Sequence, residues 1–171
     1  MLDSLVAFQD EIRATGADVK LVEKENLHFT LKFLGEITDA QVAEAKSKLQ
    51  GLALRGAEVV VRGAGAFPSL NQPRVVWAGV GPEHEALVQT IADAVISSLK
   101  GIGERDDRPF RAHITLGRVR SGRNSRQLAE LLAKNHDRIF GTVRLTALKL
   151  KSSMLTPSGP VYKDLGEYPL S

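Results

Sequence analysis

Two short segments of the chain carry the same pattern of reactive side chains. His28 and Thr30 belong to "HFTL", and His113 and Thr115 belong to "HITL", eighty-five positions later. In both segments apolar residues alternate with polar ones, as expected of a strand with one buried face. Each histidine therefore shares the polar face with its threonine, about 6.6 Å away along the strand. The repeat predicts two strands that present the same polar side chains.

Two histidines can supply an acid and a base together. Because the unperturbed pKa of imidazole is near 6.5, one ring can hold a proton at physiological pH while the other is neutral. The hydroxyls of Thr30 and Thr115 could donate hydrogen bonds to an anion held between the rings. Metal-free cleavage of a phosphodiester needs a base, an acid and donors for the phosphoryl charge. These four residues are the candidate catalytic site, and Lys32 and Arg111 add a cation to each polar row.

Composition limits the other classes of function. With 171 residues, of which 43% are hydrophobic and 25% charged, the chain fits one globular domain with a substantial core. The absence of cysteine excludes disulfides and thiolate metal sites, and we expect neither a metal nor a cofactor. No apolar run approaches the roughly 20 residues of a membrane span, and no signal-peptide pattern is present. We therefore expect a cytoplasmic monomer without a membrane partner.

Hydrophobic periodicity predicts the elements that must position the site. Helices are expected over 2–14, 38–49, 82–100 and 124–135, the second launched by a capping box at Thr38 and Gln41. Strands are expected over 18–23, 27–34, 58–62, 74–80, 109–119, 139–151 and 160–168, with a long loop at 63–73 and a turn at "TPSGP". This mixed order favours an α+β fold with antiparallel sheets over a doubly wound parallel fold. The repeat further suggests two similar lobes, each presenting one His-x-Thr to a shared cleft.

The two motifs resemble the paired H-x-T-x motifs of the two-histidine phosphoesterases. The flanking segments are similar to those of RNA 2′,3′-cyclic phosphodiesterases, also known as 2′-5′ RNA ligases, over nearly the whole chain: "ENLHFTLKFLGEI", "AFPS", "PRVVWAGV", "PFRAHITLGRV" and "GPVY". The resemblance implies an α+β fold of two pseudo-symmetric lobes, with antiparallel sheets inside and helices outside, enclosing a central cleft. It also implies hydrolysis of RNA 2′,3′-cyclic phosphate ends to a 2′-phosphate.

The resemblance also assigns roles to the four site residues. His28 would be the proton donor to the departing 3′ oxygen, and His113 would be the proton acceptor that activates water. Thr30 and Thr115 would hold the non-bridging oxygens. At its start the chain departs from the family, because relatives usually begin with an extra strand similar to "RxFIAID" and this chain starts at "MLDSLVAFQDEI". We expect residues 1–171 to form one bilobal domain that lacks the family's usual first strand.

Several further residues are candidates for substrate binding. Phe67 could stack on a base, or it could anchor its loop beneath Pro68. Arg118 opens the basic run "RVRSGRNSR", which also fits a solvated loop, and simple alternation places it on the apolar side of its strand. Tyr162 in "GPVY" could line the cleft, whereas Trp77, surrounded by valines, is predicted to lie in the core.

Three other interpretations fit the same residues. The reverse reaction would join RNA ends, such as tRNA halves, through a 2′-5′ bond. A non-catalytic module could bind RNA ends that carry a 2′,3′-cyclic phosphate or its product. A purely structural protein would keep the repeats as relics of duplication and would have no affinity for phosphate.

Overall fold

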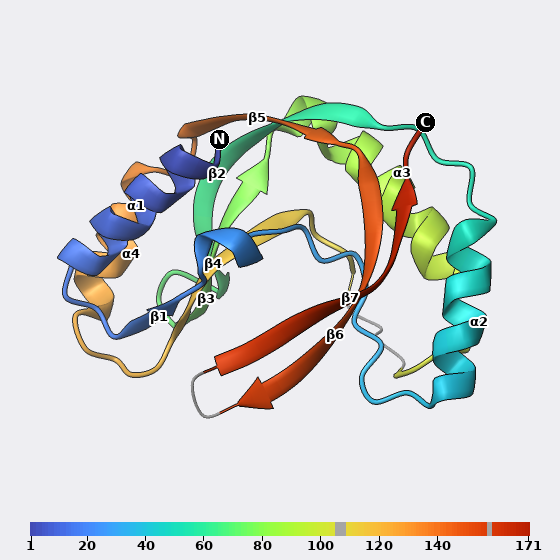
Figure 1. The fold of residues 1–171 in the computed structure, drawn as a ribbon. Coiled ribbons are helices and arrows are strands. Elements are labelled where there is room, and N and C mark those ends of the chain that lie inside the picture. Colours follow the sequence, from blue (N-terminus) through green and yellow to red (C-terminus); the bar gives the residue numbers. More distant parts are fainter. Residues whose placement is uncertain (105–108, 157–158) are drawn as a thin grey trace. The chain divides into compact units, whose positions relative to one another are not determined.

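Four α-helices and seven strands make up the described part of the chain, residues 1–104, 109–156 and 159–171 of a computed structural model (Figure 1). The α-helices are α1 (Leu2–Ala14), α2 (Asp39–Gln50), α3 (Pro82–Ser98) and α4 (Ser125–Lys134), and a short 3-10 helix, η1, spans Lys24–Asn26. The strands are β1 (Val19–Leu21), β2 (Ala57–Pro68), β3 (Pro73–Val80), β4 (His113–Val119), β5 (Ile139–Leu145), β6 (Ala147–Thr156) and β7 (Gly159–Pro169).

The strands form two sheets. The larger sheet has the order β1-β4-β3-β2-β5, and the smaller one is the β6–β7 hairpin. The pairs β1–β4, β3–β4, β2–β3 and β6–β7 are all antiparallel. The predicted α+β class with antiparallel sheets is therefore confirmed.

The chain divides into two compact units. The first contains Met1–Thr30, Glu58–Gln89 and Phe110–Val143, and the second contains Leu31–Ala57, Thr90–Pro109 and Arg144–Ser171. Both His-x-Thr motifs belong to the first unit, which differs from the expectation that each lobe would carry one motif. The reason lies in strand order: the second motif is on β4, and the first motif forms a bridge to that same strand.

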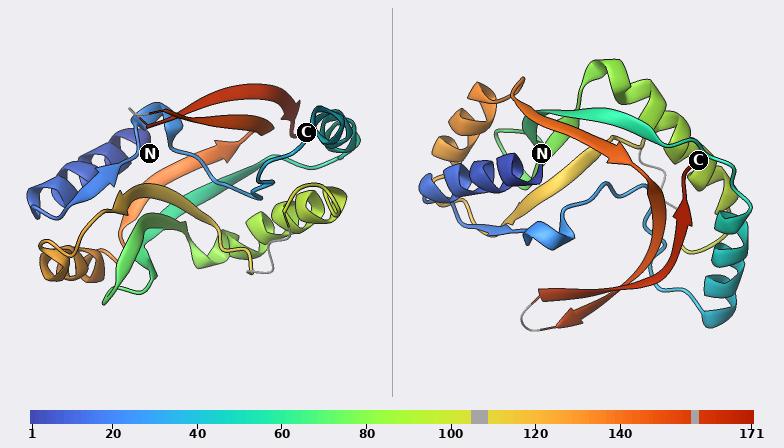
Figure 2. Two further views of the ribbon diagram at one scale, coloured as in Figure 1. Left: turned by 90° about the horizontal axis from the view of Figure 1, so that it is seen from below. Right: turned by 45° about the horizontal axis from the view of Figure 1, so that its top comes forward.

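The core of the first unit lies on one face of its sheet. α1 and α4 lie side by side there, as both views in Figure 2 show. Leu5, Phe8 and Ile12 of α1 recur at helical spacing and are fully buried, as are Leu128 and Leu132 of α4. Ile114 and Leu116 of β4 join the same cluster. Because side chains alternate along a strand, His113 and Thr115 must point to the opposite face.

The second unit has its own core, built around α2, the end of α3 and the β6–β7 hairpin. The predicted capping box starts α2: the Thr38 hydroxyl accepts the Gln41 backbone N–H at 3.3 Å, and the Gln41 side chain accepts the Thr38 N–H at 3.0 Å.

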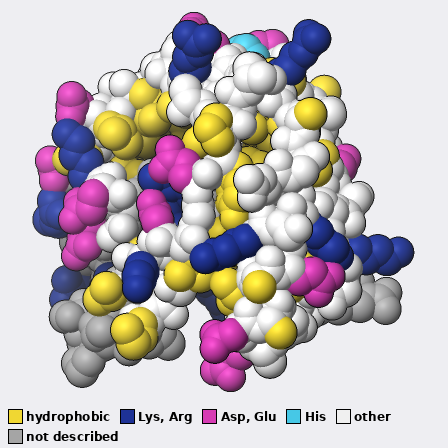
Figure 3. All heavy atoms as spheres, turned by 45° about the vertical axis from the view of Figure 1, so that its right-hand side comes forward, with side chains coloured by type: hydrophobic (Ala, Val, Ile, Leu, Met, Phe, Trp, Pro, Cys, Tyr) yellow, Lys and Arg dark blue, Asp and Glu magenta, His cyan; other side chains and the backbone are white. Residues whose placement is uncertain are grey.

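Acidic and basic side chains are interspersed on the face drawn in Figure 3. That mixture agrees with the small formal net charge of +3.

Two of the predicted elements were wrong. Residues 27–34 do not form a regular strand: Phe29 makes an isolated bridge, and Phe33, which alternation assigned to the apolar face, is 61% exposed. The predicted loop at 63–73 is largely strand, because β2 runs on to Pro68. Glycine and alanine in "GAGA" have low strand propensity, so the local sequence does not predict this extension of β2.

Other boundaries differ in smaller ways. The segment predicted as one strand over 139–151 contains two strands, β5 and the first part of β6. Asn124 precedes α4 with a left-handed backbone (φ 51°) and does not cap it; its side-chain amide donates instead to the Thr15 carbonyl at 3.1 Å. Part of the "TPSGP" turn, residues 157–158, lies outside the described residues.

Candidate active site

A single β-bridge joins the two His-x-Thr motifs. Phe29 lies antiparallel to Ile114, and both side chains pack in the core of the first unit. Continuing that register by one residue in each direction sets His28 against Thr115 and Thr30 against His113. Side chains of directly opposed residues share a face, with Cβ atoms about 5 Å apart. The bridge therefore gathers both histidines and both threonines on the face of the sheet that α1 and α4 leave uncovered.

Both imidazole rings are held in the same way. The Nδ1 atom of His28 lies 2.6 Å from the Asn26 carbonyl oxygen, and the Nδ1 atom of His113 lies 2.7 Å from the Arg111 carbonyl oxygen. A carbonyl oxygen can only accept, so Nδ1 carries a proton in each ring. In both rings Nε2 is then the nitrogen that could exchange a proton with a bound molecule. The Nε2 atom of His28 lies 3.2 Å from the Thr30 hydroxyl.

The environments of the two rings differ. His28 is exposed, whereas His113 is half-buried, with the Phe67 ring packed edge-on against it at 5.0 Å between centroids. Burial lowers the pKa of His113 below its ordinary value near 6.5, and the positive charge of Arg118 lowers it further. The hydrogen bond to the Arg111 carbonyl acts in the opposite direction. The net shift in pKa favours the neutral form of His113.

A β-bulge brings Arg118 onto the same face as the histidines. Trp77 pairs with Thr115 and Val76 pairs with Gly117, so β4 has one extra residue, Leu116. Leu116 is fully buried in the core, and a Cβ on Gly117 would lie 2.6 Å from Cγ1 of Val19, which packs in the same core. Two successive residues of β4 thus face inward.

The next residue returns to the polar face. Arg118 lies opposite Val75 on β3 and opposite Lys20 on β1. Simple alternation, which assigned Arg118 to the apolar side, is therefore wrong beyond the bulge. Its place on the face of His113 agrees with its effect on the pKa of that ring.

Trp77 belongs to the site rather than to the core. Its partner across the strands is Thr115, so its indole lies on the polar face, and it is only half-buried. The ring packs over Gly65 and against Phe67, whose ring centroid is 5.2 Å away. Phe67, at the end of β2, therefore bridges Trp77 and His113. In the sequence, this position of Trp77 was indicated by the alternating glycines of "GAGAF", because a glycine opposite a tryptophan leaves room for the ring.

The remaining candidates for substrate binding are divided between the two units. Arg111 is exposed, and its backbone carbonyl holds His113. Lys32 and Tyr162 belong to the second unit, where Tyr162 pairs with Ser153 in the β6–β7 hairpin. Within residues 1–104, 109–156 and 159–171, no three side chains of His, Asp or Glu cluster as metal ligands would.

Sequence comparison gives a consistent set of relatives. The family described as LigT like Phosphoesterase matches residues 2–77 and 80–162. A protein of Archaeoglobus fulgidus named RNA 2′,3′-cyclic phosphodiesterase is 42% identical over 147 residues, covering 86% of this chain and 81% of the relative. A protein of the same name from Aeropyrum pernix is 38% identical over 168 residues, covering 98% of this chain and 95% of the relative.

Solved structures agree with the sequence comparison. A protein of Thermus thermophilus superposes with a TM-score of 0.80 at 28% identity, covering 99% of this chain and 91% of that one. Escherichia coli LigT superposes with a TM-score of 0.76 at 22% identity and the same coverage, a likeness of fold. None of the helices in the described residues has the length and apolarity needed to cross a membrane. By its sequence and its fold, the chain belongs to the LigT-like phosphoesterase family.

Proposed function

We propose that the protein hydrolyses 2′,3′-cyclic phosphate ends of RNA to 2′-phosphate ends, using His28 and His113 as acid and base without a metal ion. The names of the relatives that match most of the chain support the substrate and the reaction. The observation that supports the mechanism is the matched position of the two rings. Each Nδ1 donates to a backbone carbonyl, so proton transfer falls to Nε2 in this proposal.

The reaction is an in-line displacement at phosphorus. The Nε2 atom of neutral His113 takes a proton from water as the water oxygen bonds to phosphorus. The bond from phosphorus to the 3′ oxygen breaks, and Nε2–H of His28 gives its proton to that oxygen. The product is a 2′-phosphate with a free 3′-hydroxyl, and the proton balance is restored when the two rings exchange protons with solvent. The lowered pKa of His113 supports the assignment of this ring as the base.

Three further groups bind the phosphoryl oxygens in this proposal. Thr30 and Thr115 donate their hydroxyl protons to the non-bridging oxygens, where negative charge develops. Thr30 can accept from Nε2–H of His28 and donate to the phosphate at once, which links the acid to the bound anion. Arg118, on the same face two strand positions beyond Thr115, supplies positive charge to the same anion.

The test is hydrolysis of adenosine 2′,3′-cyclic phosphate by protein that has been treated with EDTA. Adenosine 2′-phosphate is the expected product, identified by chromatography against the 3′ isomer. His28→Ala and His113→Ala should each reduce kcat by about 10²–10⁴-fold. The proposal fails if chelation abolishes turnover, if the 3′ isomer is formed, or if the doubly substituted protein retains full activity.

A further inference from the structure

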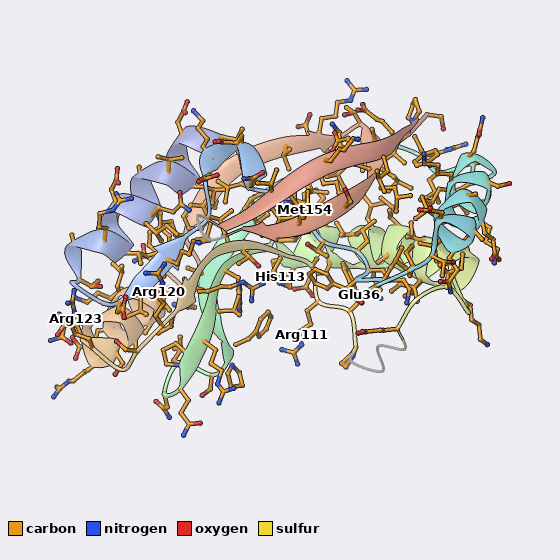
Figure 4. All side chains as sticks on the ribbon, turned by 60° about the horizontal axis from the view of Figure 1, so that its bottom comes forward. Glu36, Arg111, His113, Arg120, Arg123 and Met154 are labelled. Atoms are coloured by element: carbon orange, nitrogen blue, oxygen red, sulfur yellow. The ribbon has the colours of Figure 1, made fainter. Side chains whose placement is uncertain are left out.

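The polar face of β4 continues beyond the proposed catalytic residues. Because of the bulge, His113, Thr115, Arg118 and Arg120 follow one another on this face; we call these four residues the β4 row. The Arg120 backbone N–H donates to the Asp18 carbonyl at 2.8 Å, which extends the β1–β4 register past the end of the strand. Figure 4 shows Arg120 and then Arg123 following His113 toward α4. With about 6.6 Å for each pair of residues, the row is about 20 Å long.

The arginines of this region differ from others in the same unit. Arg13, Arg62, Arg126 and Arg138 form ion pairs with Asp10, Asp137, Glu130 and Glu11. Among the described residues, by contrast, no carboxylate pairs with Arg74, Arg118 or Arg120. Cations left close together without counter-charges favour the binding of a polyanion.

The end of the β4 row opens into a groove. Arg120 lines it together with Arg74, at the start of β3, and with the segments Asn71–Pro73 and Ser121–Gly122. The groove has a volume of about 580 Å³. Its walls carry amide, hydroxyl and guanidinium groups that can donate hydrogen bonds. A groove with two guanidinium groups and several neutral donors is suited to phosphate oxygens rather than to an apolar ligand.

We propose that Arg120 and Arg74 form a binding site for the RNA backbone, which holds phosphates of the strand that leads to the cyclic end. The inference rests on the proposed function, since the cyclic phosphate sets one end of the path. A stacked single strand advances about 3.4 Å per phosphate, so about six nucleotides span the β4 row. The site therefore selects an oligonucleotide over a mononucleotide, whichever base stands at the reacting end.

The test compares substrates of different length. For the unmodified protein, kcat/KM should be about tenfold higher for an oligonucleotide of about eight nucleotides with a 2′,3′-cyclic end than for adenosine 2′,3′-cyclic phosphate. The double variant Arg74→Gln, Arg120→Gln should lose this advantage through KM while turnover of the mononucleotide is unchanged. Lys134→Gln is the matched control, because it removes an exposed charge about 14 Å along α4 from Ser125. The ratio of kcat/KM for the oligonucleotide to that for the mononucleotide should be the same in Lys134→Gln as in the unmodified protein.

A binding measurement separates failure of this site from failure of the proposed function. Fluorescence anisotropy of a labelled oligonucleotide with a 2′-phosphate end gives Kd without any turnover. For a single strand, each phosphate contact contributes about 0.7 to the slope of log Kd against log salt. The double variant removes two such contacts, so its slope should be smaller by about 1.4. Absence of a length effect in the unmodified protein, or an unchanged slope in the double variant, overturns the proposal. The proposal would also be overturned if the double variant bound RNA as the unmodified protein does but lost binding to anionic lipid vesicles.

Discussion

Phe29 and Ile114 face each other across one antiparallel bridge, and the two His-x-Thr motifs are arranged symmetrically about that pair. Each histidine lies across from the threonine of the other motif, and each ring donates from Nδ1 to a carbonyl two residues earlier. The local arrangement is nearly symmetric, but the surroundings are not. Phe67 and Arg118 act on His113, and this difference assigns the base in the proposed mechanism.

The roles of the two histidines can be separated with a better leaving group. A nucleotide p-nitrophenyl phosphodiester expels a phenolate that needs no proton, so the acid becomes unnecessary. The defect of His28→Ala should shrink from at least about 10²-fold to within about tenfold on this substrate. The defect of His113→Ala should persist, because water still has to be deprotonated. The opposite pattern, read from p-nitrophenolate absorbance, would exchange the two roles.

The pH dependence of kcat/KM reports the state of the base. His113 must be neutral, so activity falls as pH drops through its pKa, and burial together with Arg118 puts that pKa below 6.5. Phe67→Ala admits water to the ring and should move the acidic limb to higher pH, toward 6.5. Phe33→Ala, which removes an exposed phenyl ring in the second unit, should leave the limb in place. An acidic limb above 6.5 in the unmodified protein would contradict the assignment.

The Thr115 hydroxyl is expected to act in the transition state. Thr115→Val keeps the shape of the side chain and removes the donor, so kcat should fall by about 10²-fold with a smaller change in KM. Thr115→Ser restores the donor and should recover most of the rate. If KM rises while kcat is unchanged, the hydroxyl contributes only to ground-state binding.

Gly65 should be intolerant of any side chain because of Trp77. A Cβ on Gly65 would lie 2.6 Å from Cη2 of the indole, and the ring must shift to relieve the overlap. Gly65→Ala is expected to lower the free energy of unfolding by about 1–3 kcal/mol, measured by urea denaturation. Gly51→Ala is the matched control, since its nearest atom, the Lys48 carbonyl oxygen, is 3.6 Å away. Equal stability of the two variants would show that the indole does not need this space.

Local signals predicted much of the fold and the central residues of the candidate site. α1 spans the predicted residues, and the capping box of α2 forms as its sequence indicates, because both depend on contacts within a few residues. The polar alternation of the two motifs likewise predicted which side chains would share a face. Each of these features is encoded within one strand or one helix.

Features that depend on a neighbouring strand could not be predicted in this way. The extension of β2 through its glycines is explained by Trp77 on β3, and the inward position of Gly117 is explained by Val19 on β1. Trp77 was predicted to be core because its neighbours are valines, yet its face is set by pairing with Thr115. In each case the deciding residue is distant in the sequence.

The bulge at Leu116 and Gly117 also limits how this segment can change in length. His113 and Thr115 precede the extra residue, and Arg118 and Arg120 follow it. Insertion of one residue after Gly117 would leave the histidine in place and, with alternation continuing from Gly117, turn both arginines toward the apolar core. A one-residue insertion here would therefore remove both arginines from the face that carries His113 and Thr115, a change that no single substitution in the β4 row produces.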